Sequence, residues 1–82
     1  MKYIIIERNG LEVPILFADF EDHNKIAEAL GGVNKITGAG FCQFISGDNY
    51  KALVKCYGES FTLGIKSKPE DEILINRMLN PE

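Results

Sequence analysis

The sequence contains no hydrophobic run long enough for a secretory signal peptide or a membrane-spanning helix. Its longest apolar run near the amino end is Ile4-Ile5-Ile6, and the charged residues Glu7 and Arg8 follow at once. A signal-peptide core needs at least about seven apolar residues and a membrane span about twenty. We therefore expect a cytoplasmic protein that makes no membrane contact.

Cysteine and histidine are scarce, which argues against several kinds of site. The two cysteines, Cys42 and Cys56, are too few for a disulfide scaffold, and a reducing cytoplasm keeps them as thiols. Zinc needs four close ligands, and the cysteines and His23 lack the short paired spacings of such sites. A catalytic dyad of Cys56 and His23 would need a third group to orient the base. We expect small buried thiols that pack in the core, with no metal and no cofactor.

Motifs for catalysis and phosphate binding are incomplete. Residues 56–60 lack the Gly-x-Ser-x-Gly spacing of a hydrolase nucleophile, so we interpret them as a turn. Residues 31–40 hold four glycines, of which Gly38 and Gly40 are candidate phosphate contacts. A phosphate loop runs from a strand to a helix, whereas these glycines follow a predicted helix, so a helix end and a bulged strand entry are favoured. We do not expect an enzyme.

The sequence does contain enough apolar residues to fold. Leu, Ile, Val and Phe make up 25 of the 82 residues, and no linker, repeat or low-complexity tract divides the chain. We expect residues 1–82 to form a single domain. A domain of this length buries only about 60% of its unfolded surface, so a second subunit would add to its stability.

Strand patterns dominate the chain. Asn9-Gly10 predicts a type I′ hairpin in residues 2–17, with Arg8 paired to Leu11. This register places five apolar residues on one face, namely Ile4, Ile6, Val13, Ile15 and Phe17. Residues 37–46 and 51–57 predict a second hairpin, and residues 60–66 predict a fifth strand.

Two helices complete the pattern. The first spans about residues 20–31, begins at Asp19 or Asp22, and buries Phe20 and Ala27. Ser67 and Glu70 predict a capping box before the second, which ends ahead of Pro81. The order ββαβββα predicts an α+β fold, with both helices on one face of an antiparallel sheet. The predicted core comprises Ile4, Ile6, Val13, Ile15, Leu30, Phe44, Val54 and Leu74.

His23 is the only histidine and borders the apolar stripe of the first helix. Three acidic residues, Asp19, Glu21 and Asp22, precede it closely in the sequence. We expect a boundary histidine held by these acids, and the alternative is a proton-transfer residue.

The second hairpin presents one face that no predicted helix covers. If the hairpin is symmetric about Asn49, Cys42 pairs with Cys56, and Phe44 with Val54, on the helix side. The opposite face carries Phe41, Gln43, Ile45, Lys51, Leu53, Lys55 and Tyr57. Four of these seven are apolar or aromatic, so we expect the face to touch a partner. The alternative is coverage by a loop or a terminus.

The charge distribution bears on the class of partner. Residues 35–68 carry five basic and two acidic side chains, a net charge of +3, although the whole chain carries -3. Lys51 and Lys55 share a face with Phe41 and Tyr57, a mixture that nucleotide and single-strand binders use. The net negative charge argues against tight binding to duplex DNA.

Four segments, residues 2–7, 11–17, 40–42 and 66–71, resemble small proteins of bacteriophages and prophages. The resemblance implies a class and transfers no site residue. Phage accessory proteins of this size act by binding, some to host defence proteins and some to signalling nucleotides.

We therefore expect a non-enzymatic binding protein that acts in a homodimer or on a host protein in the host cytoplasm. The alternative is a nucleotide or single-stranded nucleic-acid binder, and a small enzyme is a third possibility. The candidate site residues are Phe41, Ile45, Lys51, Leu53, Lys55 and Tyr57, with Gly38 and Gly40 added for a phosphate.

Overall fold

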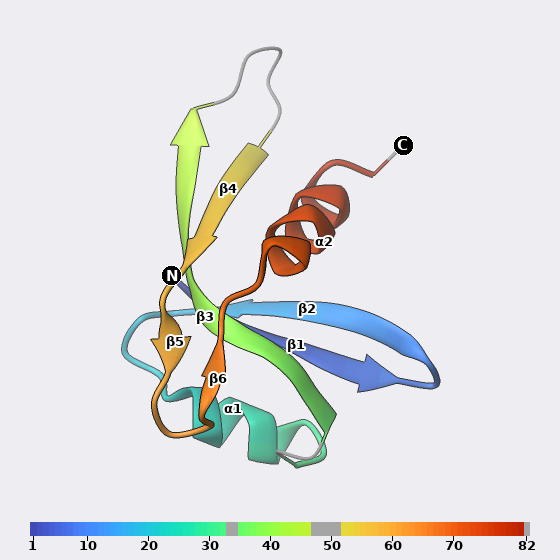
Figure 1. The fold of residues 1–82 in the computed structure, drawn as a ribbon, viewed down its shortest axis with the longest axis vertical. Coiled ribbons are helices and arrows are strands. Elements are labelled where there is room, and N and C mark those ends of the chain that lie inside the picture. The colour runs from blue at the N-terminus through green and yellow to red at the C-terminus, as the bar shows by residue number, and fades with distance from the viewer. Residues whose placement is uncertain (33–34, 47–51, 82) are drawn as a thin grey trace.

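The computed structural model describes residues 1–32, 35–46 and 52–81, and it confirms an α+β fold (Figure 1). A four-stranded antiparallel sheet has the order β2-β1-β3-β4, and β5 and β6 form a second, two-stranded sheet. Among the described residues, no helix is both long and apolar enough to span a bilayer. The elements are β1 (Lys2–Arg8), β2 (Leu11–Phe17), α1 (His23–Ala29), β3 (Ile36–Ser46), β4 (Ala52–Tyr57), β5 (Glu59–Ser60), β6 (Ile65–Lys66) and α2 (Pro69–Leu79).

The first hairpin has the predicted turn and register. Asn9 and Gly10 both adopt positive φ, 54° and 79°, as a type I′ turn requires. Arg8 pairs with Leu11, and the ladder continues to Lys2 opposite Phe17. The right-handed twist of the strands favours this turn, so the Asn-Gly pair sets the register of the whole hairpin.

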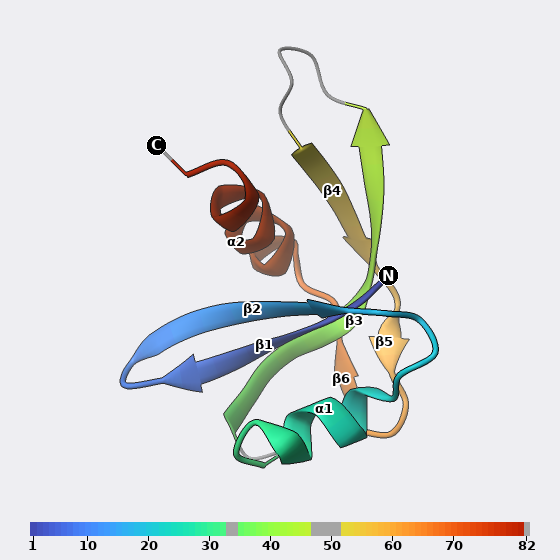
Figure 2. The ribbon, with the colours of Figure 1, turned by 180° about the vertical axis from the view of Figure 1, so that it is seen from behind.

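The helices lie on opposite faces of the sheet, which corrects the prediction of one shared face. Ile4 and Ile6 pack with Ala27 of α1, whereas Tyr3 and Ile5 pack with Ile75 of α2. Successive strand residues point to opposite faces, so the helices flank β1 from its two sides, as Figures 1 and 2 show. The run of apolar residues in β1 is typical of a strand buried on both faces.

The predicted fifth strand over residues 60–66 is wrong. Glu59 pairs with Lys66 and Ser60 with Ile65, so the segment turns back on itself as a short hairpin. Gly64 makes the reversal at φ 67°. The Ser60 hydroxyl accepts a hydrogen bond from the backbone N–H of Leu63 at 3.3 Å, a local bond that replaces ladder pairing within the turn.

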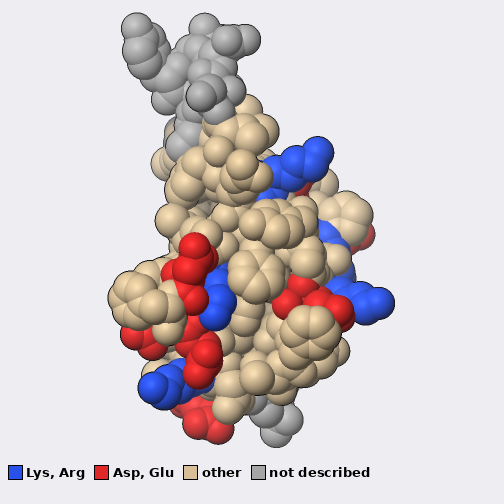
Figure 3. Space-filling view, turned by 90° about the vertical axis from the view of Figure 1, so that its left-hand side faces the viewer, with Lys and Arg blue, Asp and Glu red and all other residues tan. Residues whose placement is uncertain are grey.

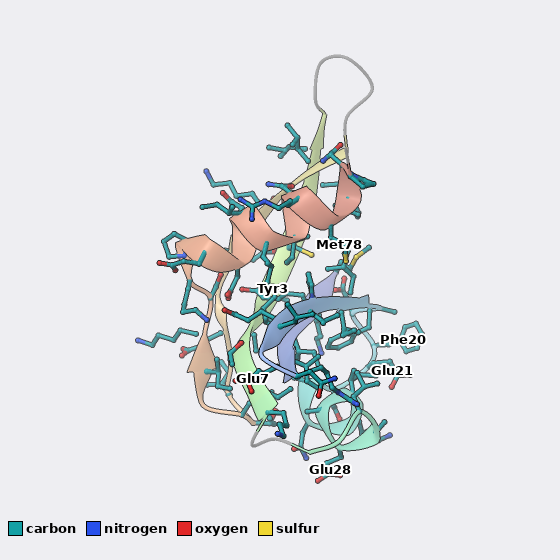
Figure 4. The ribbon with its side chains drawn as sticks, turned by 90° about the vertical axis from the view of Figure 1, so that its right-hand side faces the viewer. Tyr3, Glu7, Phe20, Glu21, Glu28 and Met78 are labelled. Atoms are coloured by element: carbon teal, nitrogen blue, oxygen red, sulfur yellow. The ribbon has the colours of Figure 1, made fainter. Side chains whose placement is uncertain are left out.

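Both helices begin at later residues than the longest spans that the sequence predicted, α1 at His23 and α2 at Pro69. Asp22, the alternative cap, precedes α1, so Phe20 lies in the preceding loop and is 85% exposed rather than buried (Figure 4). At α2 the capping pair is Lys68 and Asp71 instead of Ser67 and Glu70. The Asp71 carboxylate accepts from the backbone N–H of Lys68 at 3.1 Å.

The predicted core is correct on β1 and at Val54, and wrong at two positions. Ile4, Ile6 and Val54 are buried, and Ile15, Leu30 and Leu74 pack partly buried against the core. Val13 is exposed near the turn of the first hairpin, and Phe44 is 50% exposed. Helix α2 packs against β4. It therefore leaves Phe44 uncovered on the part of β3 that pairs with β4.

Candidate functional site

The side chains of β3 and β4 that point away from α2 form what we call the open hairpin face. The predicted pairing is confirmed: Phe41 lies opposite Tyr57, and Ile45 lies opposite Leu53. The face consists of Phe41, Gln43, Ile45, Leu53, Lys55 and Tyr57. Ile45 is 45% and Tyr57 51% exposed, whereas Phe41 and Leu53 are half-buried. Lys51, the remaining candidate, lies outside the described residues.

Figure 3 looks onto this side of the molecule, opposite α2. The described surface next to the grey atoms is mostly uncharged apart from basic side chains at its right edge, and acidic and basic side chains lie around the middle and lower parts of the view. Gln43 and Lys55 are the polar pair of the face, and both are exposed. The structure thus gathers five of the six candidate site residues of this face on a protruding, mainly apolar surface.

A row of aromatic rings connects this face to α1. His23 lies edge-to-face with Phe17 and with Phe41, at centroid distances of 5.5 and 5.6 Å. Phe41 in turn stacks on Tyr57 at 5.8 Å with an interplanar angle of 23°. Rings at such separations attract one another beyond their shared burial. The row leaves Tyr57 as the ring with most of the exposed surface.

His23 is a structural residue, and the prediction that acids hold it is wrong. Its ring is 5% exposed, and Nε2 lies 2.8 Å from the backbone oxygen of Gly40. That hydrogen bond attaches the first residue of α1 to the middle of β3. The two aromatic neighbours, Phe17 and Phe41, take the places that we expected acidic side chains to occupy.

Gly38 and Gly40 are buried, and the structure gives them a packing role. A Cβ atom on Gly38 would lie 2.6 Å from the carboxylate oxygens of Asp71. A Cβ atom on Gly40 would lie 2.7 Å from the backbone oxygen of Tyr57 and 3.3 Å from the ring of Tyr3. A phosphate at Gly38 would meet the Asp71 carboxylate, which argues against a phosphate contact at that residue.

A buried polar cluster under the start of α2 was not predicted. The Tyr3 hydroxyl donates to Asp71 Oδ2 at 2.7 Å and lies 2.8 Å from Ser67 Oγ. Lys68 Nζ lies 3.1 Å from Asp71 Oδ1. Burial raises the pKa of Tyr3, the bond to Ser67 lowers it, and the bond to Asp71 raises it further. Because Asp71 is buried, hydrogen-bonded and paired, it ties α2 to β1.

Side chains of α2 also cover the outer edge of β4. Asn76 accepts from the backbone N–H of Val54 at 2.7 Å and donates to its carbonyl oxygen at 3.1 Å. One turn earlier, Glu72 accepts from the backbone N–H of Cys56 at 2.7 Å. β4 is an edge strand of the main sheet, and unpaired edges invite other strands. The helix therefore blocks this edge at Val54 and Cys56.

A cleft of about 390 Å³ opens between the end of β4 and the start of α2. Cys56, Tyr57, Lys66, Ser67, Lys68 and Glu72 are among its lining residues. Burial is the main cause that raises the pKa of Cys56 to about 12, and the charges of Cys42, Glu72 and Asp71 add to it. A hydrogen bond with Tyr3 lowers this pKa. Burial also raises the pKa of Cys42. Both thiols are therefore weak nucleophiles at neutral pH.

The part of the chain that the structure describes contains no candidate metal-binding site. No group of three or more His, Cys, Asp and Glu side chains there could hold a metal ion. No protein family matches the chain, and comparison with curated proteins and with solved structures finds no match.

Proposed function

We propose that the protein is a non-enzymatic cytoplasmic binding protein that pairs with a second copy of itself through the open hairpin face. The exposure of Ile45 and Tyr57, on a face that α1 contacts only at Phe41 and α2 does not contact, carries the proposal. Burying such a surface between subunits removes apolar area from water.

The composition of the face favours a second copy as the occupant. Its described residues include one charged side chain, Lys55, so two identical faces can meet with little like-charge repulsion. The long, flexible lysine stem can carry its ammonium group to the rim of a contact. A two-fold arrangement, in which each face contacts the same face of its partner, is the commonest form of such association.

The test is the subunit number of variants of this face. Ile45→Glu and Leu53→Glu each place a carboxylate in the contact, where burial without a partner is costly. We expect both variants to be monomeric under conditions in which the wild type is dimeric. Sedimentation velocity across a hundredfold range of protein concentration measures the difference.

Ile73→Glu is the matched control, because Ile73 is exposed on α2, away from the face. This variant should dimerise like the wild type. A wild-type chain that stays monomeric at every concentration overturns self-association. The host protein implied by the resemblance to phage proteins would then be the alternative occupant of the same face.

Binding of nucleotide or single-stranded nucleic acid is the second candidate. The exposed Lys55 beside the Phe41–Tyr57 stack favours it, because base and phosphate could be recognised together. ATP and a fluorescent mixed-sequence single strand are suitable probes. Lys55→Glu should abolish their binding without changing subunit number, and added salt should weaken it steeply. If neither probe binds the wild type at low salt, this candidate function is contradicted.

A further inference from the structure

Cys42 and Cys56 lie directly opposite each other on neighbouring antiparallel strands. Their backbone hydrogen bonds show which kind of pair they form. The Cys42 N–H donates to the carbonyl oxygen of Met1 at 2.8 Å, and the Cys56 N–H donates to Glu72 at 2.7 Å. Each amide thus points away from the other cysteine, which makes this a non-hydrogen-bonded pair.

That register brings the two residues within disulfide range. Opposite residues of a non-hydrogen-bonded pair have Cα atoms about 4.5 Å apart, and disulfides span about 4.4–6.8 Å. Both side chains point to the face under α2 and contact the same core cluster. The strands can therefore accept a bond between the two sulfur atoms without a change of register.

The two thiols differ in access. Cys56 is half-buried and lines the cleft beside α2, whereas Cys42 is 1% exposed. The charged side chains that line the cleft are Lys66, Lys68 and Glu72, which sum to a net charge of +1, so a small anionic disulfide meets a net positive charge there. A reagent in the cleft reaches Cys56 first, and Cys42 is placed to attack Cys56 from within the protein.

We propose that this pair is a thiol–disulfide exchange site for a small anionic disulfide such as oxidised glutathione. The Cys56 thiolate attacks one sulfur of the reagent and forms a mixed disulfide, and the glutathione thiolate that leaves takes up a proton. The Cys42 thiolate then attacks Cys56 Sγ, forms the Cys42–Cys56 bond and releases the second glutathione. The protein loses two hydrogen atoms, and glutathione disulfide is reduced to two thiols.

The expected rate depends on pH. Burial raises the pKa of Cys56 to about 12, so its thiolate is a minor form at neutral pH. Below that pKa the thiolate fraction grows about tenfold per pH unit, and exchange should accelerate in proportion between pH 7 and 9. The site thus responds slowly, and a dithiol reductant should reverse it.

The test is intact-mass and peptide analysis of the reduced 82-residue chain after incubation with oxidised glutathione at pH 8. We expect the wild type to lose two hydrogen atoms and to yield a peptide pair linked through Cys42 and Cys56. Cys42→Ala should instead keep one glutathione on Cys56. Cys56→Ala is the matched control and should stay unmodified, because Cys42 is shielded.

Three results would overturn the proposal. The wild type could keep both thiols, retain glutathione on Cys56 without closing the bond, or form disulfides between copies. The wild-type experiment needs no substitution, so a variant that fails to fold does not remove the test. Circular dichroism before and after oxidation checks that the bond forms in the folded chain.

Discussion

At the residue scale, the close approach of β3 to α2 depends on a missing side chain. Gly38 leaves the space that the buried Asp71 carboxylate occupies. This carboxylate accepts from Tyr3 and from the backbone of Lys68, and it also pairs with the Lys68 ammonium. Moving it would break several interactions together, so the position tolerates no larger residue.

Gly38→Ala is therefore expected to destabilise the fold by about 1–3 kcal/mol, the usual cost of overpacking a filled site. Urea denaturation followed by circular dichroism measures the loss. Arg77→Ala is a suitable control, since an exposed helix position should change stability by no more than about 0.5 kcal/mol. Equal midpoints for Gly38→Ala and the wild type would show that the carboxylate moves without cost.

The raised pKa of Cys56 predicts a loss of stability in alkali. Its value is 9.0 when unperturbed and about 12 in the folded chain, so above pH 9 the unfolded chain releases this proton first. The free energy of unfolding then falls as pH rises from 9 toward 12. Tyr3 and Cys42 act in the same direction, because their pKa values are raised too.

Cys56→Ala should consequently lose stability less steeply than the wild type between pH 9 and 11. Urea midpoints at pH 8, 9, 10 and 11 provide the measurement. At pH 8 the thiol is protonated in both states, so any difference there reports packing alone. Identical slopes in the two proteins would mean that this thiol titrates alike in the folded and unfolded chains.

At the element scale, local signals predicted the hairpins better than the contacts between distant segments. Asn9-Gly10 sufficed for the first register, and the pairing of Cys42 with Cys56 followed from the second hairpin's symmetry. The Tyr3–Asp71 bond joins residues 68 positions apart and has no local signature. The continuous apolar run of β1 is typical of a strand buried on both faces, yet we predicted both helices on one face, and only the helix positions in the structure correct this.

A second feature at the element scale is the way side chains of α2 occupy the outer edge of β4. Asn76 satisfies both backbone groups of Val54, much as another strand would. Asn76→Ala should cost roughly 1–3 kcal/mol, because it leaves these groups without partners. It should also promote aggregation, which light scattering at raised temperature can follow. Arg77→Ala on the same helix should aggregate no faster than the wild type.

At the scale of the whole molecule, the main sheet has helices on both faces of β1, yet one face of its protruding hairpin has no helix over it (Figures 1 and 3). A chain of 82 residues gains little stability from its own core. Pairing through the open hairpin face would add to that stability by mass action, so folding and association should be coupled.

The melting temperature should therefore rise with protein concentration. A hundredfold increase stabilises each subunit of a dimer by roughly 1.4 kcal/mol, which for a domain of this size corresponds to about 6–11 °C. Ile45→Glu should melt at one temperature whatever its concentration, whereas Ile73→Glu should retain the rise, because its exposed position on α2 lies outside the face. Differential scanning calorimetry of the three proteins at matched concentrations measures this. A wild-type melting temperature that does not change over this range would mean that the folded monomer needs no partner, and that the open hairpin face serves some other molecule.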